Sequence, residues 1–203
     1  MRDSQRATLI LFSVAFIWGM TFIWMKQALA AADSHLMGVD GRWVAMHFVA
    51  FRFLIGSVFT IVLLRSSRSG FNDPEVWRGG FSLGLILILG FLIQMVGLTN
   101  VTPAVSAFLT SLYVVFTAII GVAIGRQRFT PFMLLGVVLA TFGAGWISGP
   151  PRVEFGVGEW LTVLSGFLFA LHIIVTDSVT RVVDPIQSTG TICLLYTSDA
   201  ADD

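Results

Sequence analysis

Two apolar runs in the middle of the chain limit its fold more than any other feature. The first extends from Gly80 to Leu98 and the second from Ala104 to Gly125, and only Thr99–Pro103 separates them. Each run is about as long as a helix must be to cross about 30 Å of hydrocarbon, and neither contains an ionised side chain. The pair therefore predicts a transmembrane helical hairpin, which no soluble fold requires.

The amino-acid composition of the whole chain is also that of a membrane protein. Hydrophobic residues make up 56% of the chain and charged residues only 12%, about half the charged share of an ordinary soluble domain. Further apolar runs of spanning length cover Ala7–Ala32, Trp43–Leu64, Pro131–Ser148 and Gly156–Thr176. We expect an all-α fold, a polytopic membrane helix bundle. The formal net charge of zero gives no support to nucleic-acid binding, which needs a basic surface.

The first apolar run has some features of a signal peptide. Arg2 and Arg6 precede it, and the small-residue triplet Ala28-Leu29-Ala30 lies near its end. The length of the run and the bulky Trp18 and Trp24 argue against cleavage. We expect this segment to stay in the protein as its first span.

The distribution of Lys and Arg predicts the orientation. One side of the membrane would hold the N-terminal segment and the loops after the second, fourth and sixth spans, which contain Arg2, Arg6, Arg65, Arg68, Arg78, Arg126, Arg128 and Arg181. The segments on the other side contain Lys26, Arg42 and Arg152. Cytoplasmic loops hold the excess of basic residues. The N-terminus is therefore predicted to be cytoplasmic.

A weak internal repeat relates the first and sixth spans. Phe16–Gly19 aligns with Phe167–Ala170 at an offset of one five-span unit. An odd number of spans per unit inverts the second copy, as in many secondary transporters. A chance match of aromatic and aliphatic residues is the alternative.

Four motifs carry a resemblance to a known family: Phe16–Phe22, Arg52–Phe53, Gln94–Thr110 and Gly125–Thr130. Their order and spacing, over about residues 9–190, resemble the drug/metabolite transporter (DMT) superfamily, EamA type. The resemblance implies ten helices in two inverted five-helix repeats, with both termini cytoplasmic, that move small organic metabolites and often export them.

The sequence departs from that family at two positions. Gln127 stands where the family usually has a glutamate, which weakens an ion-pair role at that turn. Val114 stands where the family often has a proline in the fourth span. Without that proline, we expect the fourth span to lack the family's helix break.

The resemblance also predicts the division of the chain. Residues 1–150 are expected to form the first EamA-like five-helix repeat, and residues 151–192 the start of the second, namely helix six and the entrance to helix seven at Val183–Ile186. Residues 193–203, which include Cys193, resemble a translated sequencing adapter, so we expect a non-native tail after a chain truncated behind its sixth helix. A natural acidic C-terminus is the alternative.

Polar and aromatic side chains inside the spans are the candidates for substrate binding, because lipid cannot satisfy them. They are Trp18, Thr21, Arg52, Gln94, Tyr113 and His172. All but His172 are expected to line one polar cavity within a compact bundle of the first five spans, and His172 is a candidate for proton coupling. Structural alternatives remain open, because Arg52 can snorkel, Gln94 and His172 can tie two helices together, and the aromatic residues can pack.

The sequence contains no motif that favours an enzyme. It has no paired intramembrane carboxylates, no nucleophile near a histidine, no phosphate loop and no metal-ligand spacing. We therefore expect no catalytic residue, metal or cofactor. The resemblance implies instead a fragment of a secondary membrane transporter, a permease or exporter with several spans in the cell inner membrane. Its expected partners are a small organic solute, the lipid bilayer, and either the second repeat or a homodimer partner. The alternative is a non-transporting membrane assembly or regulatory subunit.

Overall fold

The computed structural model describes residues 2–35, 40–63, 72–126, 128, 130–147, 156–189 and 192. These residues form helices and turns, with no strand among them. The helices are α1 (Arg2–His35), α2 (Gly41–Leu63), α4 (Pro74–Leu98), α5 (Pro103–Ser111), α6 (Tyr113–Ala123), α7 (Pro131–Ile147) and α8 (Val157–Val179). The predicted all-α membrane bundle is thereby confirmed.

Five stretches are long and apolar enough to cross a membrane by length and composition. They are Thr8–Ala32, Met46–Leu63, Pro74–Leu98, Pro103–Ala123 and Val157–Val179. The helix in the predicted fifth span, α7, has 17 residues. That length is at the short end of the range of about 17–25 residues that spanning helices have.

The start of α4 corrects one expectation. The polar sequence up to Arg78 predicts a loop, but α4 begins at Pro74. The side chain of Asp73 accepts a hydrogen bond from the backbone N–H of Glu75 (2.9 Å) and so caps the helix. Proline at the first helical position loses no hydrogen bond and has the correct φ angle. These local signals extend the helix N-terminal to the apolar run.

Two other spans begin in the same way. Thr102 precedes Pro103, and its Oγ1 accepts a hydrogen bond from the N–H of Val105 (3.3 Å). Thr130 precedes Pro131, the first residue of α7, and its Oγ1 accepts from the N–H of Met133 (3.2 Å). A capping side chain followed by proline thus starts α4, α5 and α7.

The fourth span is interrupted at Leu112, between α5 and α6. The N–H of Leu112 bonds to the carbonyl of Leu109, three residues back (3.3 Å), and the hydroxyl of Ser111 donates to the carbonyl of Phe108 (2.6 Å). Such back-bonding by serine bends helices. The expectation that this span has no break was therefore wrong, because a break forms here without proline.

The turn after α6 depends on Gly125. Its φ angle of 71° lies in the left-handed region, where a side chain is unfavourable. The N–H of Arg126 bonds to the carbonyl of Gly121 (2.9 Å), and that of Gly125 bonds to the carbonyl of Val122 (3.0 Å). This is a Schellman motif, which satisfies the last carbonyls of the helix.

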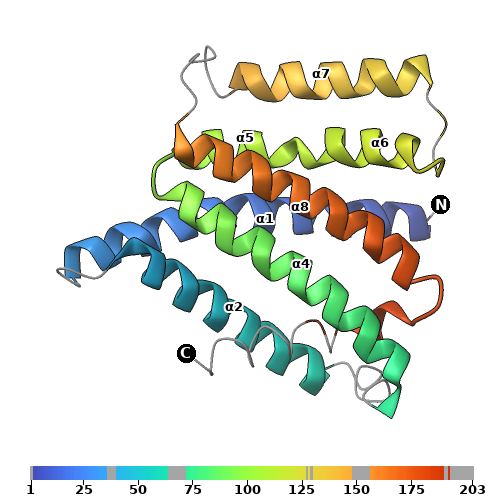
Figure 1. Ribbon diagram of the computed structural model, residues 1–203, viewed down its shortest axis with the longest axis horizontal. Coiled ribbons are helices and arrows are strands. Elements are labelled where there is room, and N and C mark those ends of the chain that lie inside the picture. The colour runs from blue at the N-terminus through green and yellow to red at the C-terminus, as the bar shows by residue number, and fades with distance from the viewer. Residues whose placement is uncertain are drawn as a thin grey trace.

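The two central helices, α4 and α8, lie side by side in the middle of the bundle and make its most extensive contact (Figure 1). Helix α8 also packs on α5 and α6, while α1 packs on α2 and α5. Helix α7 lies at the edge of the bundle, where it contacts α5 and α6. The helix expected to start the second repeat therefore occupies the centre, and the fifth helix of the first repeat does not.

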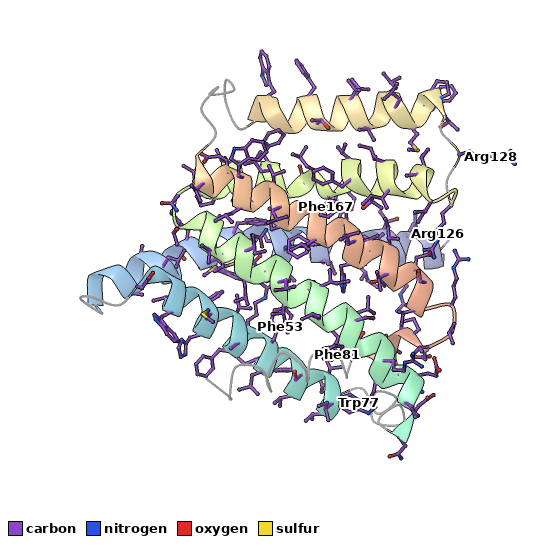
Figure 2. The ribbon with its side chains drawn as sticks, viewed as in Figure 1. Phe53, Trp77, Phe81, Arg126, Arg128 and Phe167 are labelled. Carbon is purple, nitrogen blue, oxygen red and sulfur yellow. The ribbon has the colours of Figure 1, made fainter. Side chains whose placement is uncertain are left out.

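Three phenylalanine rings join the helices of the core. The ring centroid of Phe91 on α4 lies 5.4 Å from that of Phe53 on α2 and 5.1 Å from that of Phe169 on α8. Both pairs are edge-to-face, an arrangement that aromatic rings favour. Figure 2 shows Phe53 between α2 and α4. The core around these rings consists of Phe22, Met25, Val49, Ile88, Phe91, Met95, Leu98, Val101 and Phe169.

Glycines permit the close approach of α4 and α8. A Cβ atom on Gly97 would lie 2.9 Å from the carbonyl oxygen of Gly158 and 2.8 Å from Oγ1 of Thr162. A Cβ atom on Gly158 would lie 3.0 Å from the carbonyl oxygen of Gly97. Backbone atoms cannot move aside as a flexible side chain does. The contact between α4 and α8 therefore requires small residues on both helices, as is usual where helices associate in lipid.

Candidate functional site

A cavity of about 200 Å³ lies between α1 and the α5–α6 span. We call it the inner pocket. Its lining residues are Ala15, Trp18, Gly19 and Phe22 from α1, and Ala107, Thr110, Ser111 and Tyr113 from α5 and α6. It lies beside the helix break at Leu112, where the two segments of the fourth span meet.

Two predicted site residues, Trp18 and Tyr113, meet at this pocket. Their ring centroids are 6.3 Å apart and their planes differ by 13°, so the rings are nearly parallel. One ring comes from the first span and the other from the fourth, so the bundle brings together residues that are far apart in the sequence. The pair supplies aromatic surface to a flat or cationic ligand.

Gln94 reaches the wall of the inner pocket through Thr110. Its Nε2 donates to Oγ1 of Thr110 (2.8 Å). Gln94 is 0% exposed and Thr110 3% exposed. Within the described part of the chain, Oε1 of Gln94 and Oγ of Ser106 are buried without a hydrogen-bond partner. Buried polar atoms of this kind mark places where another molecule, a solute or water, is expected to bind.

The hydroxyl of Ser111 has a defined role at the pocket. Ser111 lines the cavity, and its hydroxyl donates its hydrogen to the carbonyl of Phe108 (2.6 Å). A serine hydroxyl has one hydrogen and two lone pairs. With its hydrogen engaged, Ser111 can only accept hydrogen bonds from a ligand.

The other three predicted residues do not line the inner pocket. The hydroxyl of Thr21 donates to the carbonyl of Trp18 within α1 (2.6 Å). The guanidinium carbon of Arg52 lies 4.4 Å from the ring centroid of Phe91, a cation–π arrangement against α4. Nδ1 of His172 on α8 donates to the carbonyl of Leu83 on α4 (3.2 Å). A role for these three in substrate binding stays a prediction.

A second cavity, of about 400 Å³, lies between α6, α7 and α8. We call it the outer cleft. Its lining is mostly apolar and consists of Tyr113, Val114, Thr117, Ala118, Met133, Gly136, Val137 and Ile173. Tyr113 lines both cavities.

Sequence reasoning missed the role of Lys26. Its Nζ donates to the carbonyls of Leu98 (2.8 Å), Thr99 (3.2 Å) and Val101 (3.1 Å). These carbonyls lie at the C-terminal end of α4 and in the turn to α5, where the helix dipole favours a cation. All three hydrogens of the ammonium group are used, so Lys26 fixes the α4–α5 turn to α1. The position of a lysine near the end of the first span was visible, but its acceptors were not.

A polar cluster joins the turn after α6 to the end of α8. Nη1 of Arg126 lies 3.2 Å from both Oδ2 of Asp177 and the carbonyl oxygen of Ile174, and Nη2 donates to Oγ of Ser178 (2.8 Å). Nη2 of Arg181 also binds Oδ2 of Asp177 (2.9 Å). Figure 2 shows Arg126 at the end of α6, beside α8. The cluster holds the C-terminal end of α8 to the first five spans.

The described residues contain no group of three or more His, Cys, Asp and Glu side chains that could hold a metal ion.

Two features singled out from the sequence lie outside the described residues. They are Gln127, where the sequence differs from the family pattern, and the predicted non-native tail, residues 193–203. The segment 185–189 is a helical turn in which Oδ1 of Asp184 accepts from the N–H groups of Ile186 (2.8 Å) and Gln187 (3.3 Å). This is the geometry of a helix start, where the entrance to a seventh helix was predicted.

An all-helical bundle of apolar spans, with polar groups buried between them, is the architecture of a multispan membrane protein. Residues 5–149 match the EamA-like transporter family. The chain belongs to this family of transporters.

A curated relative agrees with this assignment. An uncharacterized transporter of Archaeoglobus fulgidus is 30% identical over 179 residues, which is 88% of this chain and 51% of the relative. The chain thus spans about half the length of that relative. No solved structure matches the chain.

Proposed function

We propose that this chain forms one half of a secondary transporter that moves a small organic solute across the cell inner membrane. The inner pocket carries the proposal, because it gathers polar and aromatic side chains between helices whose outer faces are apolar. Membership of the EamA-like transporter family supports it. Trp18 and Tyr113 would contact the solute directly, and Gln94 would act through Thr110.

The transport cycle needs a second wall for the pocket. In inverted-repeat carriers the binding site lies between two halves that rock about it. Among the described residues, only those of α1, α5 and α6 line the inner pocket. We propose that the second repeat, or a second copy of the chain, supplies the other wall, so that the 203-residue chain does not transport as a monomer.

The proposed orientation places the N-terminus in the cytoplasm. Two arginines of the predicted cytoplasmic side, Arg126 and Arg181, bind the same carboxylate, which supports their position at one end of the bundle. The start of α1 lies at that end too (Figure 1), whereas Lys26 contacts the turn at the opposite end. Labelling of a cysteine placed at Arg128, with a membrane-impermeant reagent on intact cells, checks this. Labelling from outside would contradict the orientation.

Flux through proteoliposomes tests the proposed function. The probes are radiolabelled solutes of matched size, one amine, one carboxylate and one uncharged amide. We expect saturable uptake by a version of the chain extended to the length of the Archaeoglobus relative, and none by the 203-residue chain held as a monomer. The Tyr113→Ala variant of the extended protein should lose uptake.

Two results would contradict the proposal. Saturable uptake by the verified monomer would show that no second wall is needed. Absence of uptake of every probe by the extended protein, together with stable co-purification of another membrane protein, would favour the non-transporting assembly or regulatory subunit instead.

A further inference from the structure

We propose that the inner pocket binds a small organic amine in its ammonium form, with a compact apolar body. This inference rests on the proposed function, because it names the class of solute that the pocket of the transporter takes. Four properties of the pocket support it: the charge of the lining, its aromatic surface, its hydrogen-bonding groups and its volume.

The lining of the inner pocket carries no formal charge. All eight of its residues are neutral, and none is a lysine or arginine. Carboxylates and phosphates are usually bound by arginine or lysine through charge-assisted hydrogen bonds. An anion in this pocket would be removed from water without such a partner, which is strongly unfavourable. The lining therefore disfavours carboxylates and phosphates.

Aromatic rings provide the attraction for a cation. Trp18 and Tyr113 lie with nearly parallel planes, and both line the cavity. The face of an aromatic ring carries partial negative charge, and tryptophan binds cations best of the aromatic residues. Phe22 adds a third ring to the same lining. An ammonium group can therefore bind here without a carboxylate partner.

The hydrogen-bonding groups match an ammonium group as well. Ser111 presents only lone pairs, because its hydrogen is donated to the carbonyl of Phe108. Ser111 is part of the lining, so its lone pairs are open to a ligand in the pocket. An ammonium group has three donors and no acceptor. The hydroxyl of Ser111 thus offers an acceptor to a ligand group that has only donors.

The volume limits the size of the ligand. A cavity of about 200 Å³ holds the equivalent of roughly seven liquid water molecules. Pockets for drug-sized molecules are larger, about 300–1,000 Å³. A single ring with a short ammonium arm fits this volume, and 2-phenylethylammonium is a suitable probe.

The test measures binding of tritiated 2-phenylethylammonium to the 203-residue chain in lipid nanodiscs by equilibrium dialysis. The competitors are phenylacetate, an anion of nearly the same size, and 2-phenylethanol, a neutral analogue. We expect the ammonium compound to bind about tenfold more tightly than either competitor. Equal or tighter binding of phenylacetate, or no binding of the ammonium compound, would overturn the inference.

Variants locate the binding site. Trp18→Leu should weaken binding about tenfold, and Trp18→Phe should retain part of it, because a smaller aromatic face remains. Ser111→Ala should weaken it by a smaller factor. Trp24→Leu is the matched control, since Trp24 is on the same helix, is 48% exposed and does not line the inner pocket. Equal weakening by Trp24→Leu would place the ligand elsewhere and overturn the inference. Circular dichroism and gel filtration confirm that each variant is folded.

Binding and flux together separate this inference from the proposed function. Selective amine binding without flux by the extended protein would support the inference and contradict the transporter. Saturable uptake of the carboxylate or the amide, without amine binding, would support the transporter and contradict the inference.

Discussion

The contact between α4 and α8 differs sharply from the boundary between α1 and the α5–α6 span. Where α4 packs on α8, the two backbones lie so close at Gly97 and Gly158 that neither residue has room for a Cβ atom. At the boundary, Trp18 and Tyr113 meet across a cavity of about 200 Å³, and a Cβ atom on Gly19 would meet nothing within 4 Å. The same bundle thus contains one close-packed contact and one open contact.

The difference has a physical cause. Helices in lipid gain little from hiding apolar surface, so they associate through close packing and hydrogen bonds. Small residues allow such packing between α4 and α8, whereas large aromatic rings face each other between α1 and the α5–α6 span. We infer that α4 and α8 act as the rigid part of the bundle and that the α1 side accommodates the solute.

The largest expected loss of stability is at the contact between α4 and α8. Gly97→Ala places a methyl group against the carbonyl oxygen of Gly158, and should destabilise the fold by about 2–3 kcal/mol through overpacking. Gly136→Ala is the matched control, since its added methyl group would have no neighbour within 4 Å. The control should be neutral or stabilising by up to about 1 kcal/mol, because alanine favours helix. Thermal melting in detergent, followed by tryptophan fluorescence, measures both; equal effects would contradict the close contact.

The turn between α4 and α5 gives the second prediction. Lys26→Met keeps most of the length of the side chain but removes three hydrogen bonds to carbonyl oxygens. We expect a loss of about 2 kcal/mol in stability, since hydrogen bonds to charged groups contribute about 1.5–3 kcal/mol. Lys26→Arg keeps the charge and should lose less. An unchanged melting temperature for Lys26→Met would mean that these carbonyls do not depend on the ammonium group.

The buried amide at the pocket wall gives a third, intermediate effect. Thr110→Val removes the partner of Nε2 of Gln94 and should cost about 1–2 kcal/mol, because a buried donor loses its acceptor. Gln94→Leu should cost less, since it also removes an acceptor that has no partner among the described residues. The double variant should be more stable than the sum of the two changes predicts. Additive melting shifts would contradict the hydrogen bond.

The smallest effect is expected at the exposed polar cluster. Asp177→Asn removes the ion pairs with Arg126 and Arg181, whose side chains are 39% and 68% exposed. Exposed ion pairs contribute about 0–1 kcal/mol and are screened by salt. The difference in melting temperature from the unaltered protein should therefore be small at low salt and should disappear at high salt. A large difference that persists in high salt would show that the cluster is more than a surface contact.

Much of the fold was predictable from sequence because hydropathy and helix caps are local. The apolar runs located the spans to within a few residues, except that α4 begins at Pro74, where the Asp73 cap extends the helix into a polar segment. The break at Leu112 was missed, because it depends on hydrogen bonds of Ser111 and Leu112 and not on a proline. Polarity within a span selected Gln94 and Tyr113 for attention, but it could not show which groups share a cavity.

The pattern of hydropathy along the chain was enough to predict a bundle of membrane helices, because the bilayer allows few structures other than apolar helices of a certain length. It also contained the motifs that resemble the EamA-type transporters. Three features were not visible in the sequence and follow from the packing of the helices: α8 lies at the centre, Trp18 meets Tyr113, and Lys26 binds the α4–α5 turn. These contacts join residues far apart in the chain, and they depend on how closely each pair of helices can approach.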